Sequence, residues 1–287
     1  MTASLSAPQR VPSPVALVLI GIVSVQFGAG IAKSLFDSVD PTTLAWLRLV
    51  TSAAVLLAWV RPRLRGRSRT DWLVVLGFGL ALGTMNWAIY QSFARIPLGI
   101  AVTLEFAGPL TLAVAGSRRL RDLAWVMLAG VGVLLLGIEP GDLTWAGIGF
   151  ALLAGSAWAA YILLSRSTGA RWPGMDGLAV ASTIAAVLLT PLALVHRGDL
   201  AQGRVLLLGA LIGLLSSVIP YSCELVALRS LRPAVFGILM SLEPAAAALA
   251  GWVVVHETLS WSQWAALGCV IVASLGATRD WGAEPVA

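Results

Sequence analysis

The sequence predicts an all-α integral membrane protein with ten transmembrane helices arranged as two inverted five-helix repeats. Three observations lead to this fold class. Hydrophobic residues make up 58% of the 287 residues and charged residues only 11%, whereas soluble domains carry roughly 25% charged residues. Apolar runs of about 20 residues, enough to cross ~30 Å of hydrocarbon as a helix, follow one another with short connections. The two halves of the chain also match each other in sequence.

Gly, Pro and charged residues interrupt the apolar runs and set the expected helix boundaries. The first run is longer than the roughly 7–15 apolar residues of a signal peptide, so we expect it to remain as a membrane span. The first five expected spans are Val15–Phe36, Thr42–Val60, Asp71–Phe93, Leu98–Gly116 and Asp122–Ile138. The second five are Leu143–Ser165, Met175–Val195, Arg204–Leu228, Pro233–Val255 and Ser260–Ala277.

Basic residues concentrate in alternate connections between these spans. One set of connections, with both termini, holds Arg10, Arg61, Arg63, Arg65, Arg67, Arg69, Arg118, Arg119, Arg121, Arg166, Arg171, Arg229, Arg232 and Arg279. The opposite set holds only Arg95, Arg197 and Arg204, beside Asp37, Asp40, Glu139, Asp142 and Asp199. The positive-inside rule therefore predicts that both tails, residues 1–14 and 278–287, are cytoplasmic. Arginines spread over short connections also exclude a nucleic-acid-binding face.

The two halves of the chain align with a slowly growing offset. A shift of 132 residues places Ser24 on Ser156 and Thr51 on Thr183, a shift of 135 places Pro109 on Pro244, and a shift of 139 places Trp125 on Trp264. The halves are residues 15–138 and 143–277. Each half has an odd number of spans, so the second half must lie inverted in the membrane. Inverted repeats are typical of secondary transporters, whose substrate site lies near the midplane between the repeats.

Two glutamates fall inside expected spans. Glu105 lies four residues before Pro109, and Glu243 lies directly before Pro244. A charge at the bilayer centre costs roughly 2.5–3.5 kcal/mol on insertion scales, so such residues usually mark a transport pathway. Each proline removes an i→i−4 hydrogen bond and releases the carbonyl of Glu105 or Met240. A carboxylate beside a free carbonyl would accept a cation, so both glutamates are candidates for substrate binding and for proton coupling.

A structural role remains the alternative for each of these glutamates. Glu105 could instead form an ion pair with Lys33 or Arg48, which lie in the outer halves of their spans. Lys33 and Arg48 are also candidates to bind the carboxylate of a substrate. Glu243 could likewise be part of a structural pair.

Other polar and aromatic residues inside the spans could line the same cavity. They are Gln26, Asn86, Tyr90, Trp158, Tyr161 and Tyr221. As a set they would suit a small polar ligand with an apolar part, although any one of them could simply bond to a neighbouring helix. Glu224 lies near the inner end of its span, close to Arg229 and Arg232, where a solvated ion pair is expected. Gly147, Ala151, Gly155 and Ala159 form a small-residue stripe on the sixth span that lets helices approach closely.

The sequence provides no signal for a cofactor or a metal. His256 and Glu257 lack the second histidine of a zinc HExxH motif. Cys223 and Cys269 lie in apolar segments and have no metal-ligand spacing. ATP is not expected as an energy source because the chain has no Walker motif.

Four stretches of the chain carry a resemblance to a known family. They are "GTMNWAIYQSFARIPLGIAVTLEFAGPL", "VIPYSCELVAL", "FGILMSLEPAAAALAG" and "HETLSWSQWAALG". At these residues the sequence resembles the drug/metabolite transporter superfamily in its EamA-type branch, and within that branch it most resembles bacterial exporters of threonine and homoserine. The resemblance covers about Ile20 to Gly276. It implies ten helices in two inverted repeats, the bacterial inner membrane, and efflux of amino acids or related metabolites. The loop "SRRLRD" departs from "HETLS" at the matching place in the second half.

The leading hypothesis is therefore a secondary exporter of small neutral amino acids such as threonine and homoserine, which works by alternating access and exchanges substrate for protons. An exporter of cationic drugs or other small metabolites, with the glutamates as counter-ions, is the alternative. A membrane-embedded enzyme acting on lipid would need a nucleophile and a base within reach of each other. Both histidines lie at segment ends and no Ser-His-Asp set shares one depth, so the sequence predicts a transporter and not an enzyme.

Overall fold

The computed structural model describes residues 13–115, 120–136, 143–228, 231, 236 and 239–281, which are helical apart from short connections. The first half contains α1 (Pro14–Lys33), α2 (Pro41–Val60), α3 (Arg69–Phe93), α4 (Leu98–Glu105), α5 (Ala107–Ala115) and α6 (Leu120–Leu136). The second half contains α7 (Trp145–Gly169), α8 (Asp176–Val195), α9 (Arg197–Leu200), α10 (Gly203–Gly213), the π-helical segment η1 (Leu214–Val218), α11 (Ile219–Leu228), α13 (Glu243–Ala250), the π-helical segment η2 (Gly251–Val255) and α14 (Trp261–Trp281).

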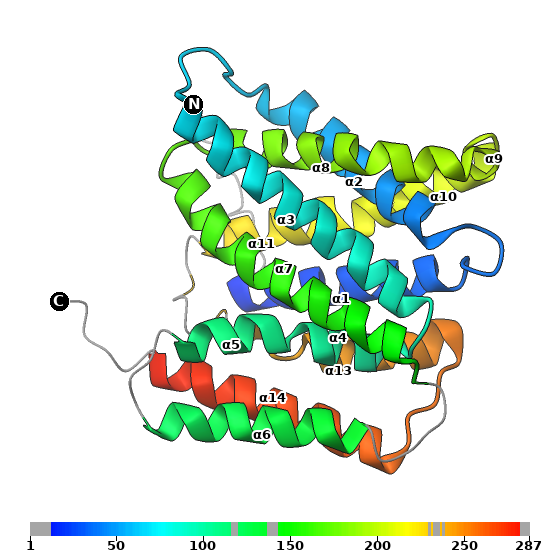
Figure 1. Cartoon of the computed structure of the whole chain (residues 1–287), viewed down its shortest axis with the longest axis vertical. Coiled ribbons are helices and arrows are strands. Elements are labelled where there is room, and N and C mark those ends of the chain that lie inside the picture. The colour runs from blue at the N-terminus through cyan, green and yellow to red at the C-terminus, as the bar shows by residue number, and fades with distance from the viewer. Residues whose placement is uncertain are drawn as a thin grey trace, which may run out of the picture.

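The helices lie side by side in one bundle (Figure 1). Helices of the first half pack mainly on helices of the second: α1 on α11, α2 on α8, α3 on α7, α4 on α13 and α6 on α14. The connection over residues 61–68 lies at the left-hand end of Figure 1, and α9 lies at the right-hand end. The two ends therefore correspond to the arginine-rich and the arginine-poor connections.

Local side-chain bonds fix where several helices begin. The side chain of Asp40 accepts a hydrogen bond from the Thr42 N–H at 2.7 Å, directly before Pro41 at the start of α2. Ser68 and Asp71 form a reciprocal capping box at the start of α3. Such bonds satisfy backbone N–H groups that have no partner within the helix.

Prolines interrupt the regular α-helical hydrogen bonding of two of the expected spans near the middle of the bundle. Leu98–Gly116 was expected as one span, but the helix is interrupted at Phe106 because Pro109 has no N–H to donate to the Glu105 carbonyl. Arg204–Leu228 was also expected as one span. It is divided into α10, η1 and α11, with Pro220 as the second residue of α11. The wider π-helical turns of η1 precede this proline, and such turns are frequent at functional sites.

Several expected boundaries were wrong by a few residues. α1 ends at Lys33 and not at Phe36, because the next residues form i→i−3 turns in which Leu35 and Phe36 donate to Ala32 and Lys33. α7 continues to Gly169 and α14 to Trp281, beyond the ends of their apolar runs. A helix can continue through polar residues after the hydrophobic signal has stopped. Residues 116–119, 137–142 and 233–235 at other expected boundaries lie outside the described residues.

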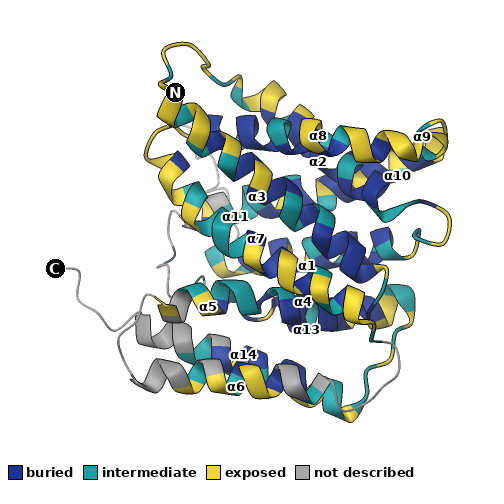
Figure 2. Cartoon of the chain, in the orientation of Figure 1, coloured by how far each residue is buried: buried dark blue, intermediate teal, exposed yellow. Residues whose placement is uncertain are grey.

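Six helices of the described chain are long and apolar enough to cross a membrane: Pro14–Lys33, Pro41–Val60, Arg69–Phe93, Trp145–Gly169, Asp176–Val195 and Gly203–Glu224. Three shorter apolar helices accompany them, Leu98–Leu112, Glu243–Val255 and Trp261–Ala273. Exposed residues occur along most of the helices in Figure 2. Large apolar side chains such as Leu73, Val187 and Leu207 are exposed, while Gln26 and Arg48 are buried. This distribution suits a protein surrounded by lipid with a polar interior.

Candidate functional site

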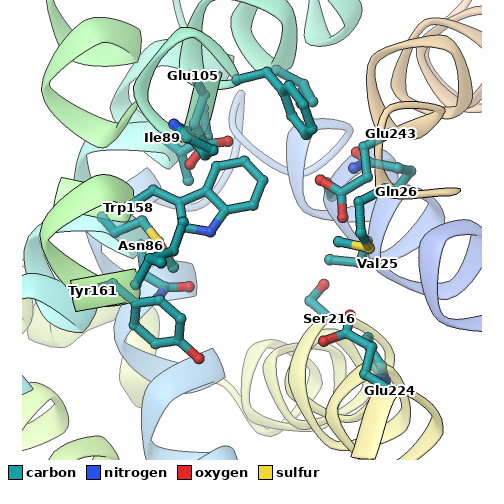
Figure 3. A pocket seen from close by; sticks show the side chains of 18 of the residues that line it. Val25, Gln26, Asn86, Ile89, Glu105, Trp158, Tyr161, Ser216, Glu224 and Glu243 are labelled. Atoms are coloured by element: carbon teal, nitrogen blue, oxygen red, sulfur yellow. The ribbon is translucent and has the colours of Figure 1, made fainter. Parts of the chain in front are cut away.

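The helices surround a cavity of about 500 Å³, within the size range of small-molecule sites. Figure 3 shows Glu105, Trp158, Asn86 and Tyr161 on one side of it, and Glu243, Gln26, Ser216 and Glu224 on the other. The first side is built from α3, α4 and α7, and the second from α1, η1, α11 and α13. Each side therefore combines helices from both halves of the chain.

Most of the residues predicted from the sequence meet at this cavity. Its wall includes Gln26, Arg48, Asn86, Glu105, Trp158, Tyr161, Tyr221 and Glu243. Phe106 packs edge-on against Trp158, with ring centroids 5.3 Å apart. The wall thus combines ionisable groups with aromatic surface, as a ligand with a polar head and an apolar side chain requires.

Two adjacent backbone carbonyls beside the cavity are free to accept side-chain hydrogen bonds. Pro220 cannot donate to the Ser216 carbonyl four residues earlier. That carbonyl accepts from Arg48 Nη2 at 2.8 Å. The neighbouring Leu215 carbonyl accepts from Ser24 Oγ at 2.6 Å. The proline in "VIPYS" thus leaves a carbonyl in the α10–α11 segment free to bind an arginine from α2.

Arg48 is the cation of the cavity wall. It is only 8% exposed, and its Nε also donates to Ser217 Oγ at 3.1 Å. The guanidinium carbon lies 5.8 Å from the centre of the Tyr90 ring. Because a guanidinium has five N–H donors, these two hydrogen bonds leave others for a bound carboxylate.

Glu105 is the last residue of α4 and lines the cavity. Among the described residues, no Lys, Arg or His nitrogen lies within 4.0 Å of its carboxylate. Its backbone carbonyl faces α7, where a Cβ added to Gly155 would come within 2.5 Å of the oxygen. The released carbonyl therefore packs against protein, and the expectation that it joins the carboxylate in one cation-accepting spot is not supported. The predicted role of Gly155 in close helix approach is confirmed.

Glu243 is the first residue of α13 and is 9% exposed. It lies across the cavity from Glu105 (Figure 3). Pro244 follows it at the start of the helix, where a missing N–H costs nothing. Glu105 thus lies at the C-terminal end of α4, and Glu243 lies at the N-terminal end of α13.

Sequence reasoning missed three polar residues of the wall, Glu224, Ser216 and Ser165. Glu224 was expected in a solvated ion pair, but it lines the cavity; Arg229 and Arg232, its expected partners, lie outside the described residues. Ser216 was not singled out at all, yet it also lines the cavity. The rule applied to Pro109 and Pro244 would have found it, because Ser216 lies four residues before Pro220.

Three buried oxygen atoms near the cavity have no hydrogen-bond partner among the described residues: Asn86 Oδ1, Tyr90 OH and Ser216 Oγ. The Asn86 side-chain nitrogen donates to the Leu82 carbonyl at 2.8 Å. Asn86 therefore presents its Oδ1 as an acceptor, and its amide nitrogen keeps a second N–H. Buried polar atoms without partners are rare in proteins, so their gathering here distinguishes this cavity from an ordinary packing defect.

Two predicted site residues do not line the cavity. Tyr90 is fully buried behind Arg48 and supports the guanidinium with its ring. Lys33 forms an ion pair with Glu257 at 2.5 Å and donates to the Ile96 carbonyl at 2.6 Å. Lys33 is therefore neither the partner of Glu105 nor placed to bind a substrate in this cavity. Its long side chain reaches the end of the bundle instead.

Known proteins match the chain over nearly its full length. The family model described as the EamA-like transporter family matches residues 145–279. The threonine/homoserine exporter RhtA of Salmonella typhimurium is 41% identical over 276 residues, which are 95% of this chain and 93% of the relative. The chain belongs to the EamA-like transporter family. RhtA of Escherichia coli strain K12 is 40% identical over 92% of this chain and 91% of its own length.

More distant proteins also resemble the chain. The uncharacterized transporter YwfM of Bacillus subtilis is 30% identical over 83% of this chain and 84% of its own length. A solved crystal structure with 20% identity superposes with a TM-score of 0.63, covering 92% of this chain and 96% of that one, so it shares the fold. The chain is thus a multi-pass membrane protein of a transporter family.

Proposed function

We propose that this EamA-like transporter is a secondary active exporter of small neutral amino acids such as threonine and homoserine. The observation that carries the proposal is a single cavity with carboxylates and one anchored guanidinium. A zwitterion needs an anion for its ammonium group and donors for its carboxylate. Glu105 and Glu243 supply the first, and Arg48 supplies the second. The relatives that are 40–41% identical carry the name threonine/homoserine exporter.

Transport would occur by alternating access between two inverted repeats, residues 15–138 and 143–277, with both tails on the cytoplasmic side of the bacterial inner membrane. The ten spans are the six long helices, the broken α4–α5 segment, α6, the segment that ends with α13 and η2, and α14. If spans one to five correspond to six to ten, then α2–α8, α4–α13 and α6–α14 each pair equivalent spans. The same correspondence converts the α1–α11 contact into the α7–α3 contact, and both contacts are present. A two-fold axis in the membrane plane would produce this pattern.

Proton exchange is the proposed energy source, with Glu105 or Glu243 as the carrier. Each elementary charge that crosses 100 mV contributes about 2.3 kcal/mol, so one proton can drive substantial accumulation. Glu105 has no ion pair among the described residues, and such a carboxylate can alternate between a proton and the ammonium group of a substrate.

The test is efflux from proteoliposomes loaded with radiolabelled threonine, at two pH values. The wild type should release threonine faster when the external medium is acidic, because inward proton movement is coupled to export. Glu105→Gln should abolish this pH dependence. Asp37→Asn, which removes a carboxylate from an exposed connection, is the matched control and should behave as wild type. Normal pH-dependent efflux by Glu105→Gln would remove Glu105 from the coupling role.

Export of cationic compounds is a second candidate, because the described part of the cavity wall contains three glutamates and one arginine. In that case the glutamates act as counter-ions and Arg48 serves only to balance charge. Cells that express the protein would then grow in otherwise toxic lipophilic cations but not in excess threonine or homoserine. The opposite result supports amino-acid export.

A further inference from the structure

The single lysine of the chain forms a polar cluster at the right-hand end of Figure 1, where α1 ends, α4 begins and η2 ends. Lys33 Nζ lies 2.5 Å from Glu257 Oε1 and donates to the Ile96 carbonyl at 2.6 Å. The Leu98 N–H donates to the second carboxylate oxygen, Oε2, at 2.8 Å. The cluster therefore joins α1, the α3–α4 turn and the segment after η2. We call it the Lys33–Glu257 latch.

The local backbone is shaped to present Glu257 at this place. His256 has a left-handed conformation, with φ of 60°, which turns the chain back at the end of η2. The Glu257 N–H then donates to the Gly251 carbonyl at 3.1 Å. A Cβ at Gly251 would come within 2.5 Å of Glu257 Oε2, so the glycine leaves room for the carboxylate to fold inward. The Lys33 and Glu257 side chains are 14% and 16% exposed, which makes the ion pair largely desolvated.

Close helix packing accompanies the latch. A Cβ at Gly30 would lie 3.2 Å from Val254 Cβ, so α1 rests directly on η2. A Cβ at Gly99 would lie 2.8 Å from Ala248 Cα, so α4 rests directly on α13. The latch thus closes an end of the bundle that is already tightly packed.

The cavity extends toward the other end of the bundle. Its wall includes Ser165 and Glu224, which lie in the C-terminal parts of α7 and α11. The connection after α7 contacts the start of α3: Trp172 Nε1 donates to the Asp71 carbonyl at 3.3 Å. That end carries the arginine-rich connections, which the proposed orientation places in the cytoplasm. The latch then lies on the outer side.

We propose that the Lys33–Glu257 latch is the outer gate of the transport pathway. It holds α1, α4 and the α13–η2 segment together while the cavity is reached from the cytoplasmic side, and it separates when the cavity opens outward. The proposal rests on the proposed function only in taking the cavity as an alternating-access pathway with this orientation. It assigns a role to Lys33 and to the "HETLS" stretch, neither of which contributes to the cavity.

In sequence, the offsets that relate the proposed repeats do not match Lys33 and Glu257 to a second lysine–glutamate pair. The shift of 132 residues that matches Ser24 to Ser156 matches Lys33 to Ser165, and the shift of 139 that matches Trp125 to Trp264 matches Arg118 to Glu257. A serine and an arginine cannot reproduce the lysine–glutamate pair. The lysine–glutamate pair at the outer end therefore favours the outward-closed state at rest.

The test measures access to the cavity from outside the cell, without any substrate. In a background with Cys223→Ser and Cys269→Ser, Ala29→Cys places one thiol on the cavity wall. A membrane-impermeant maleimide added to intact cells should label it slowly while the latch is intact. Adding Lys33→Met should raise the labelling rate about tenfold, because loss of the ion pair shifts the population toward the outward-open state.

Two controls keep the result specific. Arg171→Met removes an ion pair to Asp71 at the opposite end and should leave the labelling rate unchanged. Ala185→Cys places a thiol in the fully buried core and should stay unlabelled with Lys33→Met, since only unfolding exposes it. Three results would overturn the proposal: fast labelling of Ala29→Cys with the latch intact, no increase with Lys33→Met, or an equal increase at Ala185→Cys. The labelling rates can be interpreted in the same way even if the protein does not transport threonine.

Discussion

Glutamates meet both ends of the short helix α4, and they differ in their partners. At its first residue, Glu257 accepts a hydrogen bond from the Leu98 N–H and pairs with Lys33. At its last residue, Glu105 faces the cavity, and no cationic group of the described chain lies within 4.0 Å of it. Both carboxylates are largely withdrawn from solvent, so burial alone does not separate their roles.

The two glutamates differ in whether the protein itself supplies partners for their hydrogen bonds and charge. A carboxylate whose oxygens are already occupied holds helices in place, and removing it leaves other buried groups without partners. A carboxylate whose partner is missing from the protein must find one in a substrate or a proton. The difference teaches that a glutamate inside a membrane protein is interpreted from its neighbours, and that Glu257 is structural in the state described here while Glu105 is available for transport.

The sharpest way to break this comparison is to replace each glutamate by glutamine. Glu105→Gln should reduce threonine efflux more than about tenfold without lowering the apparent Tm, because it removes a half-buried charge that has no ion pair among the described residues. Glu257→Gln should lower the free energy of unfolding by about 1–3 kcal/mol, because Lys33 and the Leu98 N–H lose part of their acceptor. Efflux assays and thermal unfolding in detergent measure both effects. If Glu105→Gln unfolds the protein more readily than Glu257→Gln, the distinction is wrong.

The packing of α4 between the two glutamates provides the next test. Gly99→Ala should destabilise the protein by about 1–3 kcal/mol, because its Cβ would lie 2.8 Å from the backbone of Ala248. Gly149→Ala is the matched control, since its Cβ would meet no atom within 4 Å and alanine favours a helix by roughly 1 kcal/mol over glycine. Thermal unfolding of both variants measures this difference in stability. Equal stability would show that α4 can move freely against α13.

The smallest expected effect concerns Tyr90. Its hydroxyl is buried without a hydrogen bond among the described residues, while its ring supports Arg48. Tyr90→Phe keeps the ring and should change the free energy of unfolding by less than about 1 kcal/mol, with threonine efflux close to wild type. A large loss of efflux with unchanged Tm would instead place the hydroxyl on the substrate. Tyr90→Leu, which removes the ring, should weaken efflux by loosening Arg48.

Much of the candidate site followed from local sequence rules. An ionisable residue in an apolar run is visible without any structure, so Glu105, Glu243 and Arg48 were identified. The proline rule explained the break at Phe106, and it would have identified Ser216 had it been applied to Pro220. The role of Glu224 was missed because the choice between a surface ion pair and a cavity depends on how α11 is rotated. Hydrophobicity along a nearly uniformly apolar helix does not determine that rotation.

The sequence by itself determined that this is an all-helical membrane protein, roughly where its helices begin and end, and which residues could carry charge into its interior. These properties depend on the length of apolar runs and on caps and prolines, which act over a few residues. Only the tertiary structure decided which charge meets which. Lys33 pairs with Glu257 and Arg48 bonds to Ser216, far along the chain in each case. Electrostatic pairing depends on distances of a few ångströms between helices, and these are set by packing in three dimensions.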